Sequence, residues 1–252
     1  MARLFLALLL ACPAVAAAAD DPQVIVFETL ARVAVGADGQ PMEVRGSGDL
    51  PGPLREFVES SVRDWQFEPV VVDDEARQGT TWVRLSVCAV PRADGFALSS
   101  RYVGNGPGPA GGAAHVDPPQ YPRDALHAGA SGDMTVNYTV GTDGVATLDS
   151  IEYAQGEQKR MRRYFHRALG DWVRAMRYQP EELDGQPVAT RISTPVSFRL
   201  DMPGTRAEFE QQIVGRWQDS PECLAAEGHQ PQGQLLSAQS PFVFRDMAPA
   251  GP

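Results

Sequence analysis

Side chains that could carry out catalysis or bind a metal are scattered along this sequence. No histidine stands near a cysteine or a second histidine at the short spacing that zinc sites use. His166 lies among three arginines on a predicted helix, which indicates a solvated basic face, with contact to an acidic partner as the alternative. No nucleophile elbow, phosphate loop or dinucleotide fingerprint is present. We therefore expect no enzyme activity, no metal site and no small-molecule cofactor. The four histidines are His115, His127, His166 and His229.

The first nineteen residues have the composition of a secretory signal peptide. Arg3 precedes a short apolar run, and a stretch of small residues ends at Ala19. We predict cleavage there and export of the mature chain. Two alternatives stay open: a lipoprotein attached through Cys12, and an uncleaved inner-membrane anchor, although a bilayer span needs about 20 apolar residues.

Cleavage at Ala19 leaves two of the three cysteines in the mature chain, Cys88 and Cys223. An oxidising compartment permits them to pair. They are disulfide candidates, and two buried thiols are the alternative, because the sequence does not place their Cα atoms within bridging distance.

The composition indicates a globular, acidic chain. It has 252 residues, 43% of them hydrophobic, and 22 Lys and Arg against 32 Asp and Glu, for a net charge of -10. The apolar fraction is too high for a disordered protein. Because nucleic acids are bound by clustered basic residues, the excess of acid argues against a nucleic-acid partner.

The first half of the chain predicts strand, turn, strand, helix, strand. Strands are expected over 24–35 and 42–45, joined by a turn at Asp38-Gly39. An amphipathic helix follows from Leu54 to Trp65, and a closing strand runs over 80–87.

The second half repeats this order after a short helix over 121–129. A strand over 134–140, a turn at Asp143-Gly144 and a returning strand precede a helix over 160–177. The last strand covers 189–200, with Ile192, Thr194, Val196, Phe198 and Leu200 on one face. Trp65 and Trp172 take equivalent predicted helix positions, which core packing explains.

Matching elements in the two halves indicate an internal duplication. The predicted fold class is α+β, with two tandem domains that each have a small antiparallel sheet and helices packed on one face. The boundaries are a signal peptide at 1–19, a first domain at 20–90, a Gly/Pro-rich linker at 91–116, a second domain at 117–202 and a C-terminal tail at 203–252. The tail is expected to hold one helix over 206–217 and loops, with one strand at Phe242–Phe244.

The second half resembles the TonB C-terminal domain family over about 85 residues. The resemblance is carried by the order and spacing of short motifs, and the first half resembles the same domain in degenerate form. The motifs are Pro119–Pro122, Asp143-Gly144, Tyr178–Pro180, Gly185–Val188 and Pro195–Leu200.

The resemblance implies that the last strand binds a partner by strand addition. In this family, the TonB box of an outer-membrane receptor adds as a strand beside the last strand of the domain, so that main-chain hydrogen bonds provide affinity. The resemblance also implies a periplasmic location for the exported chain, and the partner would be an outer-membrane receptor or another envelope protein. The implied partner-binding residues are Gln120, Tyr121, Pro122, Arg191, Ile192, Ser193, Thr194, Pro195, Val196, Ser197 and Phe198.

Departures from the family limit this implication. Energy transducers carry a membrane anchor and a long Pro-Lys linker, whereas this chain has a predicted signal peptide and is acidic. A binding module linked to TonB-dependent transport is the first hypothesis. The alternatives are a scaffold that self-associates through its sheet edges, and an anchored transducer if the N-terminal segment is uncleaved.

Overall fold

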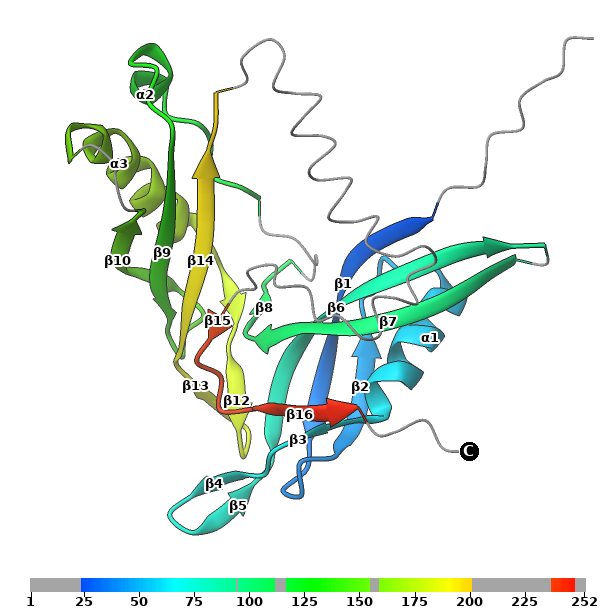
Figure 1. Cartoon of the computed structure of the whole chain (residues 1–252). Coiled ribbons are helices and arrows are strands. Elements are labelled where there is room, and N and C mark those ends of the chain that lie inside the picture. The colour runs from blue at the N-terminus through cyan, green and yellow to red at the C-terminus, as the bar shows by residue number, and fades with distance from the viewer. Residues whose placement is uncertain (1–23, 94, 112–116, 155–158, 201–236, 248–252) are drawn as a thin grey trace, which may run out of the picture.

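The computed structural model describes residues 24–93, 95–111, 117–154, 159–200 and 237–247 (Figure 1). These residues form antiparallel sheets with three helices. The predicted signal peptide and the predicted tail helix lie outside the described residues.

The second half contains an antiparallel sheet with the order β10-β9-β14-β15. Its strands are β9 (Gly132–Val140), β10 (Ala146–Tyr153), β14 (Thr190–Phe198) and β15 (Ser237–Ala238). Buried and half-buried residues alternate along β9, as expected for a strand with only one face in the core.

Two helices cover the buried face of this sheet: α2 (Arg123–His127) and α3 (Lys159–Ala175). The apolar residues of α3 recur every three or four positions, so they form one stripe. That stripe packs on β9 and β14, where Phe165 stacks on Phe198 with ring centroids 4.8 Å apart. These elements confirm an α+β fold with an antiparallel sheet and helices on one face.

The first half is built around β1 (Ile25–Val35), which pairs with β2 (Pro41–Gly46) on one side and β6 (Gly79–Arg92) on the other. Helix α1 (Gly52–Arg63) packs Val58 and Val62 into the core. The predicted helix was too long at its end, because Trp65 belongs to β3 (Trp65–Phe67), where its ring is buried.

Both halves contain the same glycine turn. Gly39 and Gly144 have φ of +82° and +76°, and a Cβ on either would lie 2.1 Å from a backbone oxygen, that of Phe67 or Tyr178. The same two residues donate their N–H groups to the glycine carbonyls, at 3.0 Å and 2.9 Å. The Asp-Gly turns thus also anchor the chain beyond each helix.

Gly144→Ala is expected to lower the free energy of unfolding by about 3 kcal/mol, because it adds left-handed strain to a backbone clash. Gly185→Ala is the matched control: its φ is also +76°, but its Cβ would meet nothing within 4 Å. The control should cost about 1 kcal/mol. Urea unfolding of both variants checks this, and equal losses would contradict the role of the clash.

A hairpin from the second half joins the sheet of the first half. Strand β12 (Glu181–Leu183) pairs with β13 (Gln186–Val188) and with the start of β6, where Glu182 lies opposite Thr80. In the first half, β4 (Val70–Val72) and β5 (Glu75–Arg77) form the hairpin at the matching place in the chain. One sheet therefore contains strands from both sides of the predicted linker.

The prediction that residues 91–116 form a linker is wrong for most of the described part of that segment. Strand β7 (Gly95–Gly106) pairs with β6 from Arg92 back to Trp82, and β8 (Gly108–Pro109) pairs with β11 (Tyr178–Gln179). Backbone hydrogen bonds to a neighbouring strand offset the entropy that a glycine-rich segment loses on ordering. Composition alone does not reveal such a neighbour.

The last described residues are also strands rather than the loops expected for most of the tail. Strand β15 pairs with β14, and β16 (Phe244–Met247) pairs with β3. The predicted strand at Phe242–Phe244 was placed too early, since β16 begins at Phe244. Phe242 is buried in the core of the first half, and Phe244 stacks on Tyr102 with ring centroids 4.1 Å apart. The C-terminal segment therefore touches both halves (Figure 1).

Candidate functional site: the edge of the last sheet strand

Strand β14 presents one row of backbone groups away from β9. The N–H of Gln239 donates to the carbonyl oxygen of Arg191 at 2.8 Å. The backbone N–H and carbonyl of Arg191 therefore point outward, toward the C-terminal segment. Backbone groups alternate in direction along an antiparallel strand, which places Ser193, Pro195 and Ser197 on the same outer edge. Pro195 is tolerated at this outer position because its missing N–H does not remove a hydrogen bond to β9.

This outer edge is paired over only two residues of the described chain. Strand β15 lies opposite Ile192 and Ser193, while β9 occupies the other side along the whole of β14. Among the described residues, no strand pairs with the outer edge from Thr194 to Phe198. In Figure 1, no strand accordingly runs beside the upper part of β14 on that side.

The side chains of β14 divide between core and surface, as the sequence predicted. Ile192, Val196 and Phe198 are buried against the helices. On the opposite face, Ser193 donates to Asn137 Oδ1 at 2.5 Å and Ser197 donates to Asp133 Oδ1 at 2.6 Å. These polar contacts run back toward β9 and leave the backbone edge uncovered.

The second group of predicted site residues is Gln120, Tyr121 and Pro122. It contacts β14 through the ring of Tyr121. The ring of Tyr121 lies edge-on to Phe198, with centroids 5.2 Å apart, and its hydroxyl donates to the carbonyl of Ala130. Gln120 is exposed. The structure thus brings Tyr121 to the far end of β14 and leaves Gln120 at the surface.

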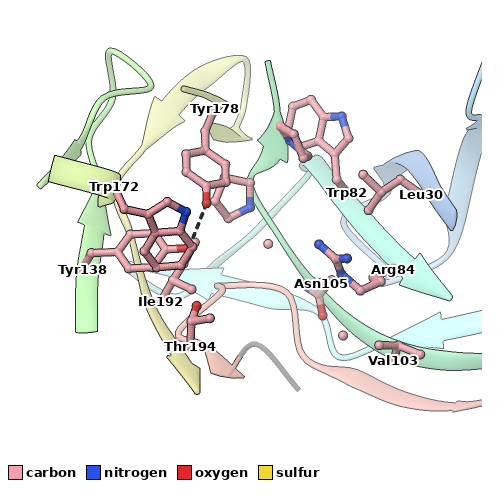
Figure 2. A pocket seen from close by; sticks show the side chains of 14 residues that line it. Leu30, Trp82, Arg84, Val103, Asn105, Tyr138, Trp172, Tyr178, Ile192 and Thr194 are labelled. Atoms are coloured by element: carbon pink, nitrogen blue, oxygen red, sulfur yellow. Dashed lines mark hydrogen bonds between the residues drawn. The ribbon is translucent and has the colours of Figure 1, made fainter. Parts of the chain in front are cut away.

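A pocket of about 170 Å³ lies where the two halves meet, and we call it the junction pocket (Figure 2). Strands β1, β6 and β7 form one wall, and β9, α3, β11 and β14 form the other. Its lining residues are Leu30, Trp82, Arg84, Val103, Gly104, Asn105, Gly106, Pro107, Pro109, Tyr138, Trp172, Tyr178, Ile192 and Thr194.

Sequence reasoning missed most of this pocket. Trp172 packs against the core of the second half, as predicted, but it is only half-buried, and its indole N–H donates to the carbonyl of Asp117 at 2.7 Å. No sequence pattern links Trp82 to Trp172, because they meet only when the two halves pack together.

Two buried tyrosines form the polar part of the wall. The hydroxyls of Tyr138 and Tyr178 lie 2.8 Å apart and are hydrogen-bonded. Burial raises the pKa of both above the ordinary value of 10.0, and each tyrosine also modifies the pKa of the other. Both hydroxyls therefore stay protonated at neutral pH, and the pocket wall they form carries no charge.

A buried carboxylate lies at the junction of three segments. Glu181 is fully buried and accepts hydrogen bonds from Thr81 of the first half at 2.6 Å, Thr190 at the start of β14 at 2.7 Å, and Ser240 of the C-terminal segment at 2.6 Å. Asn105 extends the network by donating to Ser240 Oγ at 2.8 Å. Burial raises the pKa of Glu181, and these hydrogen bonds offset part of that shift.

The described residues offer one cysteine and no cluster of metal ligands. Cys88 is disulfide-bonded, and both other cysteines lie outside the described residues, so its pairing with Cys223 stays a prediction. In the described part of the chain, no three His, Cys, Asp or Glu residues come together in a group that could hold a metal ion. No described helix is long and apolar enough to cross a membrane.

The fold and its edge define residues 117–200 as a small α+β domain with an antiparallel sheet and helices on one face. These residues match the family model of the Gram-negative bacterial TonB protein C-terminal, and they belong to the TonB C-terminal domain family.

Two relatives support this assignment. The proteins named "Protein TonB" of two strains of Xanthomonas campestris pv. campestris, B100 and ATCC 33913, are each 30% identical to this chain over 87 residues. The match covers 34% of this chain and spans 37% of the length of these curated relatives.

Proposed function

We propose that this chain binds an extended segment of an outer-membrane receptor, or of another envelope protein, by strand addition at the outer edge of β14. The observation that carries the proposal is the row of outward backbone groups from Ser193 to Ser197, which β15 pairs only at its beginning. An unpaired strand edge is a template for another strand, and its main-chain hydrogen bonds supply affinity.

The first half supports the proposed strand addition, because β6, which corresponds to β14, already has a strand paired along its outer edge. Strand β6 follows the hairpin β4–β5 as β14 follows β12–β13, and both close their sheets beside the central strand. The outer edge of β6 is paired with β7 from Trp82 to Arg92. We infer that the first half is a degenerate copy of the second, with its own docking edge filled by β7.

The assignment to the TonB C-terminal domain family supports a binding role linked to TonB-dependent transport in the envelope of a Gram-negative cell, rather than an enzymatic one. We place the mature protein in the periplasm on the basis of the predicted signal peptide. Lipid attachment through Cys12 and an uncleaved anchor remain the alternatives, and mass spectrometry of the mature N-terminus distinguishes the three.

Blocking one outward N–H tests the proposal. Ser197→Pro removes a donor from the free edge and is expected to weaken binding of TonB-box peptides about tenfold, the value of one good hydrogen bond. Ser197→Ala is the matched control: it loses the 2.6 Å hydrogen bond to Asp133 but keeps its N–H, so it should change affinity less than about threefold.

The measurement is calorimetric titration together with amide chemical shifts of the full chain. Bound peptide should shift the amides from Arg191 to Phe198. Receptor binding by strand addition is excluded if saturating peptide leaves those amides unmoved.

Self-association is the second candidate, because this edge already pairs with a strand of its own chain. A scaffold that joins two copies would place β15 or another edge strand of one copy on β14 of the next. Analytical ultracentrifugation with amide exchange tests the scaffold: a concentration-dependent dimer supports pairing between copies, and a monomer with slowly exchanging amides along both β6 and β14 supports pairing within one chain.

A further inference from the structure

We infer that the junction pocket receives one large apolar side chain from the strand that adds to β14. This inference rests on the proposed strand addition and gives it side-chain specificity. The partner is then an extended peptide with a leucine-like or aromatic residue at one fixed position, beside Thr194.

The position of the pocket next to the docking edge is the first step. Ile192 and Thr194 of β14 line the pocket, and so do residues 103–106 of β7 (Figure 2). Strand β15 lies beside β14 and also contacts β7. A strand that continues along β14 therefore starts at the mouth of the pocket.

Side-chain direction is the second step. Side chains alternate between the two faces of a strand, and neighbours across a sheet share a face. Because the side chain of Thr194 points toward the pocket, the partner residue directly beside it points there as well. The residues before and after it in the partner face the other side of the sheet.

The chemistry and size of the pocket are the third step. Leu30, Trp82, Trp172 and Ile192 give it apolar walls, while the one cationic lining residue, Arg84, is paired with Glu28 at 3.3 Å. Pockets for whole small-molecule ligands measure about 300–1,000 Å³. At about 170 Å³, the junction pocket fits one side chain better than a complete ligand.

The two-residue pairing of β15 must open when a partner covers the whole edge. Ser193 and Ser237 lie opposite each other, two residues from the hydrogen-bonded Arg191 and Gln239, so the N–H of Ser237 faces β14 and that of Ala238 faces away. Ser237→Pro therefore removes a hydrogen bond from this pairing and makes the edge more accessible.

The probe is a synthetic peptide that copies residues 233–240, Gly-Gln-Leu-Leu-Ser-Ala-Gln-Ser. Laid on β14 in the register of β15, it places Leu236 beside Thr194 and Leu235 beside Pro195. Binding to the full chain carrying Ser237→Pro is measured by calorimetry, by amide shifts of β14 and by tryptophan fluorescence. The L236D peptide should bind at least tenfold more weakly than the unchanged peptide, whereas the L235D peptide should lose less than threefold.

A change in the protein gives an independent test. Thr194→Phe fills the mouth of the pocket and should abolish the difference between the L235D and L236D peptides, while Thr194→Val, which keeps the shape of threonine, should preserve it. Circular dichroism establishes that each variant is folded, and the peptide series stands without them.

The outcomes separate the two proposals. If the unchanged peptide binds and shifts the β14 amides but L235D and L236D are equally weak or equally strong, the pocket inference is wrong and strand addition stands. If neither this peptide nor a TonB-box peptide shifts those amides, strand addition itself is wrong.

Discussion

Replacing Glu181 by alanine should lower the free energy of unfolding by about 3 kcal/mol, because two buried hydroxyls, of Thr81 and Thr190, and the half-buried hydroxyl of Ser240 lose their acceptor at once. The three donors come from the first half, the second half and the C-terminal segment. Glu181→Gln keeps the volume and an acceptor oxygen and should cost about 1 kcal/mol. Chemical denaturation of the full chain measures both values.

The same residue makes stability depend on pH, and Glu181→Gln isolates its contribution. The folded-state pKa of Glu181 is raised above its ordinary value of 4.5 by burial. Between these two values the folded protein binds a proton that the unfolded chain lacks, so stability rises as the pH falls across this window. The contribution is fully present below about 4.5 and is lost as the pH rises through the folded-state pKa.

The stability difference between wild type and Glu181→Gln should therefore shift in favour of wild type on acidification from neutral pH toward 4.5. Exposed carboxylates contribute equally to both proteins and cancel in the difference. A difference that stays constant over this range would contradict the buried position of the carboxylate.

Phe242→Ala should lower the free energy of unfolding by about 3–4 kcal/mol, the usual cost of removing a buried aromatic ring. The Phe242 side chain is 2% exposed and packs in the core of the first half. Asn105 also holds its carbonyl oxygen at 3.0 Å. The adjacent Val243, which is 49% exposed, is the control, and Val243→Ala should cost less than about 0.5 kcal/mol.

Urea unfolding with limited proteolysis measures this effect. Loss of the Phe242 anchor should expose the C-terminal segment to cleavage before the rest of the chain unfolds. Equal stability of the two variants would show that the segment adds nothing to the core of the first half.

These two residues determine how independent the two halves are. The sequence suggests tandem domains joined by a linker, but Glu181 bonds across the junction, β12 pairs with β6, and Phe242 brings the C-terminal segment into the first core. The halves share a sheet and a hydrogen-bond network. We therefore expect them to unfold as one cooperative unit rather than in two steps.

The sequence by itself determined the elements whose signals are local. Each of these signals involves residues only a few positions apart. They are the alternation along β9 and along β14, the helical spacing of Phe165 and Leu169, and the two Asp-Gly turns. Such short-range patterns predicted the strands, the helices and the buried face of β14, including Ile192, Val196 and Phe198.

Only the tertiary structure decided the features that need a distant neighbour. Residues 95–106 of the predicted linker form a strand because β6 lies beside them. The segment around Phe242 is ordered because Phe242 packs in the core of the first half and β16 pairs with β3. The junction pocket and the Glu181 network join residues about one hundred positions apart. No local pattern encodes such contacts, because their free energy is gained only when the two halves pack together.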